Sequence, residues 1–331
     1  MADKKDKAVV KESKESGEEY DFIIIGAGVA GLSAAMYAAR LGLKTLCLGA
    51  CCGTELPIGG VVTTTKTIEN YPGFMSISGV ELAEKIKKQA ESYPLVAIRA
   101  EKVEDIEKNG RKFAVKTSKR NYWAKTILFA TGAKWRKLEV PGSTEFENRG
   151  VAYCALCDAP LYKNKAVAVV GGANSAARDA LILAEYAKKV YILYRGERLK
   201  AEQANIDKIM KSKNIEVVYK VNISEIKGGK KVKAVLLDRE FNGKKELELD
   251  GVFVAIGHIP NTELAKKLGV ALNDKGEIIL NHKTSETSVE GVYAAGDVVD
   301  KPFKQAMTGV AEGCTAAYAA FERIQKNTIE D

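Results

Sequence analysis

The sequence predicts an α/β protein made of two domains, each built around a parallel sheet. Its 331 residues exceed the size at which a single hydrophobic core usually stops growing, so length alone favours two domains. The chain also repeats one pattern of strand, glycine turn, helix and strand, once near its N-terminus and once near its middle. Hydrophobic residues make up 46% of the chain and charged residues 28%, as in ordinary globular proteins, which excludes a disordered or low-complexity chain.

The first repeat begins with a short apolar strand, residues 22–25, followed at once by a glycine-rich turn of Gly26, Ala27, Gly28, Val29, Ala30 and Gly31. An apolar helical pattern then runs to Ala39, and a second strand follows at 45–48. In such a G-x-G-x-x-G turn, the first glycine makes the turn, the second lets the backbone approach a pyrophosphate, and the third packs helix against strand. The helix N-terminus offers unpaired N–H groups to the phosphates. The spacing therefore predicts a dinucleotide site.

The second repeat has the same order when Val167 is aligned with Phe22. Its strand, residues 167–170, leads into a turn of Gly171, Gly172, Ala173, Asn174, Ser175 and Ala176. A helical pattern and a strand at 190–193 follow. Alanine is accepted at the third glycine position, but Ala173 places a methyl group where a pyrophosphate comes closest. We therefore expect a second dinucleotide site with weaker contact to the pyrophosphate.

Composition and charge exclude several classes of partner. Residues 22–39 carry no charge and reach the length of a membrane span, but their short strand and glycines argue against a transmembrane helix. The net charge of +8 is spread over runs such as 85–88 and 227–233, which lack aromatic residues, so solvated surface is favoured over nucleic-acid binding. Six cysteines are too few for a disulfide scaffold, which favours a reducing compartment, the cytoplasm. The first 19 residues mix lysines with acids and are expected to form a charged, disordered tail.

Two more apolar strands each end in a turn whose glycine lets the backbone come close to a ligand. The first, residues 126–130, ends at Thr131 and Gly132, and the second, residues 291–295, ends at Gly296 and Asp297. The Asp297 carboxylate is placed to accept hydrogen bonds from ribityl or ribose hydroxyls, with a structural cap of the next turn as the alternative. A final helix is expected at 305–324, and its positive N-terminal end points toward the same ligand. Together with Lys304, this end favours the negative charge of a reduced flavin.

A Cys-x-x-Cys-Asp motif, formed by Cys154, Cys157 and Asp158, lies just before the second repeat. Cys-x-x-Cys is either half of a zinc site or a redox dithiol. Zinc needs four ligands, and the sequence has no second Cys-x-x-Cys, its histidines stand alone, and Cys51 and Cys52 are adjacent rather than spaced. A dithiol at this spacing can close as a disulfide, and Asp158 can give a proton to a leaving thiolate. The motif therefore favours redox chemistry without a metal.

Taken together, these residues resemble the low-molecular-weight thioredoxin reductases, over nearly the whole chain from Tyr20 onward. Further motifs that carry the resemblance lie at 59–60, 63–65, 68–73, 130–132, 257–262, 295–297 and 304–306. The larger glutathione-reductase relatives carry their cysteine pair in the first domain and use a C-terminal His-Glu pair, and both features are absent from this sequence. The resemblance implies two Rossmann-like, three-layer domains, with the nicotinamide domain inserted into the FAD domain.

Domain boundaries and partners also follow from the resemblance. It implies a discontinuous FAD domain at 20–134 and 262–331, and an NAD(P)H domain at 135–261 that carries the dithiol. The connections near Lys134 and at 257–261 are the expected hinges between the two. Thioredoxin or a glutaredoxin-like protein is the implied acceptor, and a homodimer is the implied assembly.

The resemblance assigns roles to individual residues. The expected FAD residues are those of 26–31, with Gly59, Gly60, Asn70, Thr131, Gly132, Gly296, Asp297, Lys304, Gln305 and Ala306. The expected NAD(P)H residues are those of 171–176, with Tyr194, Arg195 and Lys200. Cys157 is expected to face the flavin, Cys154 to exchange with the protein substrate, and Asp158 to act as the acid.

One departure from the family leaves the electron donor open. Tyr194, Arg195 and Gly196 stand where members usually have His-Arg-Arg to hold a 2′-phosphate, and Lys200 stands where a further arginine is common. No acid at the end of the strand selects NADH either. NADPH and NADH therefore both remain possible electron donors. Three alternative functions also remain: a dithiol oxidase that uses oxygen, a disulfide reductase fed by ferredoxin or a reduced deazaflavin, and a non-enzymatic flavin redox sensor.

Overall fold

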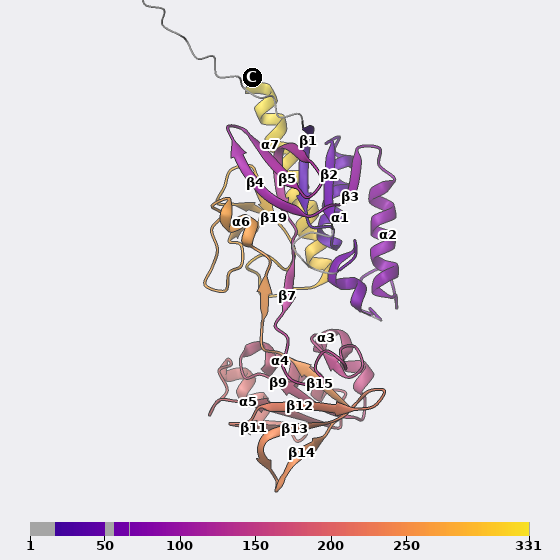
Figure 1. The fold of residues 1–331 in the computed structure, drawn as a ribbon, viewed down its shortest axis with the longest axis vertical. Helices are drawn as coiled ribbons and strands as arrows, with labels where there is room; N and C mark the ends of the chain where they lie inside the picture. Colours follow the sequence, from indigo (N-terminus) through magenta and orange to yellow (C-terminus); the bar gives the residue numbers. More distant parts are fainter. Residues whose placement is uncertain (1–16, 50–55, 66, 331) are drawn as a thin grey trace, which may run out of the picture. The chain divides into compact units, whose positions relative to one another are not determined.

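The computed structural model describes residues 17–49, 56–65 and 67–330 (Figure 1). The chain divides into two compact units, one formed by Met1–Thr63, Ala83–Gly132 and Thr262–Asp331, the other by Thr64–Leu82 and Ala133–Asn261. Residues 64–82 thus group with the second unit, although the resemblance puts them in the FAD domain, and the domain boundaries stay a prediction. Most of the expected tail, together with Cys51 and Cys52, lies outside the described residues.

The first unit contains a sheet whose central strands are parallel, in the order β3-β2-β1-β6-β19. These strands are β1 (Glu18–Ile25), β2 (Thr45–Gly49), β3 (Val96–Ala100), β6 (Asn121–Phe129) and β19 (Val292–Ala294). Antiparallel strands extend it: β4 (Val103–Asn109), β5 (Lys112–Thr117), β17 (Leu280–Asn281) and β18 (Glu286–Thr287). Because a central parallel strand is covered on both faces, its residues form a continuous apolar run. This is why the sequence predicts a strand at residues 22–25, all of which are buried.

Helices and loops cover both faces of this sheet. The elements are α1 (Val29–Arg40), η1 (Gly60–Thr64), α2 (Gly79–Glu91), α6 (Glu263–Lys267) and α7 (Ala306–Glu330). Phe22 and Ile24 pack against α1 and α7, whereas Ile23 and Ile25 join the opposite core, which includes Phe113. The expected helix at 305–324 is confirmed but longer, because no glycine or proline ends it before Glu330.

The second unit repeats this plan on a smaller scale. Its parallel sheet has the order β11-β10-β9-β15-β8, and a separate antiparallel sheet has the order β12-β13-β14. The strands are β8 (Val151–Ala152), β9 (Ala166–Val170), β10 (Lys189–Tyr194), β11 (Ile215–Tyr219), β12 (Ile223–Gly228), β13 (Val232–Phe241), β14 (Lys244–Glu248) and β15 (Gly251–Val254). The helices are α3 (Ala155–Asp158), η2 (Ala159–Tyr162), α4 (Asn174–Ala184) and α5 (Gln203–Lys211).

Alternate residues of β9 again divide between two cores. Val167 and Val169 pack with α4, whereas Ala168 and Val170 pack with the antiparallel sheet. The three layers of this unit are therefore helices, a parallel sheet and an antiparallel sheet. The predicted α/β class, with two Rossmann-like units of three layers, is confirmed.

The two expected hinge segments pair with each other. β7 (Ala133–Trp135) and β16 (His258–Pro260) form an antiparallel ribbon, and the N–H of Arg136 donates to the carbonyl of Gly257 at 3.0 Å. The segments that lead into and out of 133–261 therefore run side by side. Within the described residues, no helix combines the length and the apolar character needed to cross a membrane.

Candidate active site

The first glycine turn packs directly against the turn after β6. Gly26 has φ +112°, and a Cβ atom there would collide with the Ala130 carbonyl and lie 2.9 Å from the Thr131 nitrogen. A Cβ on Gly31 would collide with the Gly26 carbonyl oxygen. Only glycine fits these positions, and their packing brings the turn at 26–31 beside Thr131.

A third loop completes this cradle. The N–H of Gly59 donates to the Ala27 carbonyl at 2.7 Å, and a Cβ on Gly60 would lie 3.0 Å from the Gly28 Cα. Gly28 is the residue before α1 and offers no side-chain cap, so it has no side-chain atom that accepts a hydrogen bond from the first N–H groups of α1. A backbone surface without side chains, at the start of a helix, fits a pyrophosphate.

The C-terminal turn reaches the same end of α1. A Cβ on Gly296 would lie 3.3 Å from the Ala30 Cβ, and one on Gly309 would lie 3.5 Å from the Gly296 Cα. Gln305 immediately precedes α7, and its N–H donates to the Thr308 hydroxyl at 3.2 Å. The starts of α1 and α7 therefore converge on Gly296, next to the half-buried Asp297.

Lys304 has its ammonium group turned into the protein. Its Nζ donates to the carbonyls of Asp297 at 2.7 Å and Val299 at 2.9 Å, and pairs with Glu277 at 2.8 Å. The contact of Lys304 with a flavin therefore stays a prediction. The sequence reasoning missed Glu277, which the fold brings to this point from a distant loop.

A second lysine–glutamate pair holds the same segment. Lys301 pairs with Glu312 of α7 at 2.7 Å, and Glu312 also accepts the N–H of Gly296 at 2.8 Å. Sequence reasoning missed both residues. The signal was present, because Glu312 is the single acidic residue in the apolar stretch 305–321.

The two cysteines of the motif form a disulfide in the second unit. Cys154 and Cys157 are joined across a Cα–Cα distance of 5.3 Å, within the range of ordinary disulfides. Cys154 caps the short helix α3, because its sulfur accepts the N–H of Cys157 at 3.2 Å. The Cys154 sulfur thus accepts a backbone N–H, a contact that favours its thiolate form.

Asp158 ends α3 and is partly buried. Burial disfavours its charged form and raises the pKa of the Asp158 carboxyl to about 6. A carboxyl that titrates this close to neutrality can both give and accept a proton under cellular conditions.

The second glycine turn is shaped by backbone contacts of its own. Gly171 has φ +139°, and a Cβ there would lie 3.1 Å from the Ala176 Cβ. The N–H of Lys200 donates to the Gly172 carbonyl at 2.6 Å, which fastens the loop after β10 to this turn. A Cβ on Gly172 would collide with the ring of Tyr194.

The first residue of α4 is engaged by a carboxylate. The Asn174 side-chain oxygen accepts the N–H of Glu202 at 2.6 Å, and its amide donates to the Glu202 carboxylate at 3.2 Å. Ala173 is exposed and precedes α4 with no side-chain cap. Sequence reasoning missed Glu202, whose carboxylate and N–H both contact Asn174.

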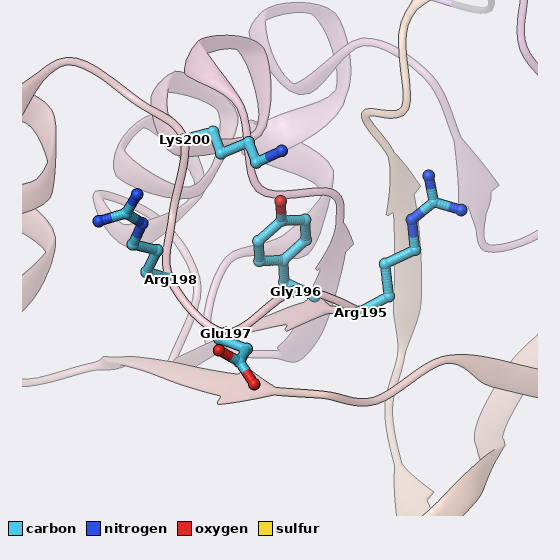
Figure 2. Close-up of a pocket in the computed structure, with 6 residues that line it drawn as sticks. Arg195, Gly196, Glu197, Arg198 and Lys200 are labelled. Atoms are coloured by element: carbon cyan, nitrogen blue, oxygen red, sulfur yellow. The ribbon is translucent and has the colours of Figure 1, made fainter.

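The loop after β10 forms a pocket of about 500 Å³. It is lined by Tyr194, Arg195, Gly196, Glu197, Arg198 and Lys200 (Figure 2). Figure 2 shows the cationic groups of Arg195, Arg198 and Lys200 spread around the pocket. Glu197 pairs with Lys220 at 2.8 Å, which offsets its charge. A cationic pocket of this kind suits a phosphate.

Comparison with known families decides the assignment. Residues 20–313 match the family described as pyridine nucleotide-disulphide oxidoreductase, a range that includes both glycine turns and the disulfide. The chain belongs to the pyridine nucleotide-disulphide oxidoreductases. Enzymes of this family that reduce thioredoxin use FAD and a nicotinamide dinucleotide, and the two glycine cradles fit those two groups.

Within this oxidoreductase family, the chain is similar to proteins named as thioredoxin reductases. It is 40% identical over 308 residues to the thioredoxin reductase of Treponema pallidum, covering 92% of this chain and 97% of that one. It is 39% identical over 325 residues to NADPH-dependent thioredoxin reductase 3 of Arabidopsis thaliana, of which it spans 61%. The crystal structure of thioredoxin reductase from Streptococcus pyogenes superposes with a TM-score of 0.84 at 35% identity, covering 94% of this chain and all of that one.

The predicted site residues of this oxidoreductase thus fall into groups. The structure brings together the expected FAD residues 26–31, Gly59, Gly60, Thr131 and Gly296. It also brings together residues 171–176, Tyr194 and Lys200, and separately Cys154, Cys157 and Asp158. Asn70 lies in segment 64–82, which groups with the second unit, and its role stays a prediction.

Proposed function

We propose that the chain reduces the disulfide of thioredoxin or of a glutaredoxin-like protein, with electrons from NAD(P)H that pass through FAD and the Cys154–Cys157 disulfide. The observation that carries the proposal is this disulfide at the N-terminus of α3, next to a carboxyl whose pKa is raised to about 6. The thioredoxin reductases to which the chain is similar support the choice of acceptor.

Bound FAD would take two electrons from the nicotinamide and deliver them to the disulfide. Opening the Cys154–Cys157 bond then leaves a thiolate at Cys154 and a thiol at Cys157. Asp158, the residue after Cys157, would supply the proton of this thiol and regain one from solvent. The N–H of Cys157, which donates to the Cys154 sulfur at 3.2 Å, would stabilise the thiolate at Cys154.

The protein disulfide is reduced by thiol–disulfide exchange. The Cys154 thiolate attacks one sulfur of the acceptor, and the other acceptor sulfur leaves with a proton from Asp158. Cys157 then gives its proton to the Asp158 carboxylate and attacks Cys154, which restores the Cys154–Cys157 disulfide and the Asp158 carboxyl. The second acceptor sulfur is released as a thiolate and takes up a proton from solvent. The acceptor gains two electrons and two protons, and the chain returns to its starting state.

We infer that NADPH is the preferred donor. Arg195, Arg198 and Lys200 surround the pocket after β10, and their positive charge suits the additional phosphate of NADPH. Lys220 offsets the charge of Glu197. Glu197 is therefore a weak hydrogen-bond acceptor for the two free ribose hydroxyls of NADH. A homodimer and a cytoplasmic location belong to the same proposal.

The test is an anaerobic mixing experiment with the purified yellow protein. NADPH and NADH are added in separate cuvettes, followed by thioredoxin and a chromogenic disulfide. We expect rapid bleaching with NADPH, slower bleaching with NADH, and turnover only when thioredoxin is present. Bleaching by neither donor would contradict the proposed donor and favour ferredoxin or a reduced deazaflavin. Bleaching without turnover would contradict the proposed acceptor.

A further inference from the structure

The segment between Gly296 and α7 has two lysines turned inward. Lys304 donates to the carbonyls of Asp297 and Val299 and pairs with Glu277, at distances of 2.7, 2.9 and 2.8 Å. An ammonium group has three N–H donors, and these three acceptors use all of them. Both partners are well buried, since the Lys304 side chain is 16% exposed and that of Glu277 6% exposed.

Lys301 fastens the other side of the same segment. Its ammonium group contacts both carboxylate oxygens of Glu312, at 2.8 and 2.7 Å, and the hydroxyl of Thr308 at 3.2 Å. Glu312 in turn accepts the N–H of Gly296. The turn at 296–299 is therefore tied both to the loop of Glu277 and to the first turns of α7.

Each of these ties is electrically neutral. A lysine that faces a ligand adds a positive charge to its surroundings, whereas one that contacts a buried carboxylate at 2.8 Å forms a pair whose distant field largely cancels. The first turn of α7 contains no acidic residue, and its backbone N–H groups belong to neither ion pair.

We propose that Lys304 is a positioning residue of the FAD site: it holds Asp297 and the start of α7 in place, and Glu277 cancels its charge. The proposal rests on binding of FAD by the first unit. The field that favours a reduced flavin then comes from the N-terminus of α7. This differs from the interpretation of Lys304 as a direct source of positive charge for the flavin.

Three variants of the FAD-loaded protein separate these two roles: Glu277→Gln, Lys304→Met and the double variant. The measurements are the FAD midpoint potential, by reduction with dithionite in the presence of reference dyes, and the FAD dissociation constant. Neither measurement needs NAD(P)H or thioredoxin, so failure of the proposed donor or acceptor leaves this test intact. Protein that binds no FAD at all would contradict the cofactor assignment instead.

We expect Glu277→Gln to raise the midpoint potential, because it exposes the charge of Lys304, and Lys304→Met to lower it, because it exposes the charge of Glu277. The double variant should return to the wild-type potential while binding FAD severalfold more weakly. A double variant that keeps the lowered potential of Lys304→Met would overturn the proposal, since the lysine charge would then act on the flavin directly. Unchanged FAD affinity in the double variant would also overturn it.

Two controls guard against general damage to the fold. Lys304→Arg keeps the charge and the donors, and it should keep both the potential and the affinity close to wild type. The pair of Lys267 and Asp105, at 2.6 Å, joins α6 to β4 at other elements of the same unit. Removing this pair in a double variant should change neither quantity, and a change as large as that in the Glu277 and Lys304 double variant would contradict a specific role for Lys304.

Discussion

Asp158, the residue after Cys157, has a carboxyl whose acidity is changed by its surroundings. Its carboxyl lies at the end of α3, directly after Cys157, and burial raises its pKa to about 6. The sequence alone shows that Asp158 lies next to the cysteine motif, because it directly follows Cys157 along the chain. The raised pKa was not, because it depends on what packs around the carboxyl.

The first prediction concerns this residue. Asp158→Asn removes the proton donor and should lower the rate of thioredoxin reduction by about 100-fold, the lower range for loss of an acid–base catalyst. In the wild type, the protonated form of Asp158 is lost as the pH rises through about 6, so the rate of acceptor reduction by pre-reduced protein should fall across that range. Stopped-flow measurements from pH 5 to 8 test this, and an identical pH profile in Asp158→Asn would contradict the assignment.

The pair of Lys304 and Glu277 was invisible in the sequence for a related reason. Glu277 meets Lys304 only because the fold brings their loops together, and no local pattern encodes that contact. By contrast, the glycines at 26–31 were found without a structure, since their function requires a fixed spacing along the chain.

Among the secondary-structure elements, the start of α1 depends on the absence of a side chain at Gly26. The second prediction is that Gly26→Ala costs several kcal/mol, because a Cβ there collides with the Ala130 carbonyl at a positive φ. Gly42→Ala is a matched control, since Gly42 has φ +87° but no atom within 4 Å of an added Cβ. Thermal unfolding and FAD retention should fall much further for Gly26→Ala than for Gly42→Ala. Equal losses would show that backbone strain alone, and not the collision, is responsible.

Helix α4 contains a carboxyl outside the proposed chemistry, that of Asp179. Burial raises the pKa of Asp179 to about 7, above its ordinary value of 3.8. The folded protein therefore holds this proton more tightly than the unfolded chain, and stability is lost as the pH rises from about 4 through about 7.

The third prediction follows from this sign. Asp179→Asn should raise the free energy of unfolding at pH 8 by about 1–2 kcal/mol, since it removes a buried charge, and change it little at pH 4. Urea unfolding at both pH values measures this, with Asp207→Asn on the exposed face of α5 as the control. A loss of stability at pH 8 would mean that the ionised carboxylate has a stabilising partner.

At the scale of the whole molecule, the repeated glycine turns made most of the fold predictable. They marked β1, α1 and β2 to within a few residues, and did the same for β9, α4 and β10. The antiparallel strands β12–β14 were not predicted, because strands with one face toward solvent and irregularly mixed polarity carry a weak pattern. The end of α7 was expected too early, at residue 324, although no glycine or proline follows Gly313 in this helix, which continues to Glu330.

In the proposed function, electrons follow one path, from NAD(P)H through FAD to the Cys154–Cys157 disulfide. Anaerobic titration with NADPH tests that path directly, with a Cys154→Ser and Cys157→Ser double variant beside the wild type. The wild type should consume one equivalent of NADPH more than the double variant before its flavin is fully bleached, because the disulfide takes up two further electrons. Equal consumption by the two proteins would contradict the path.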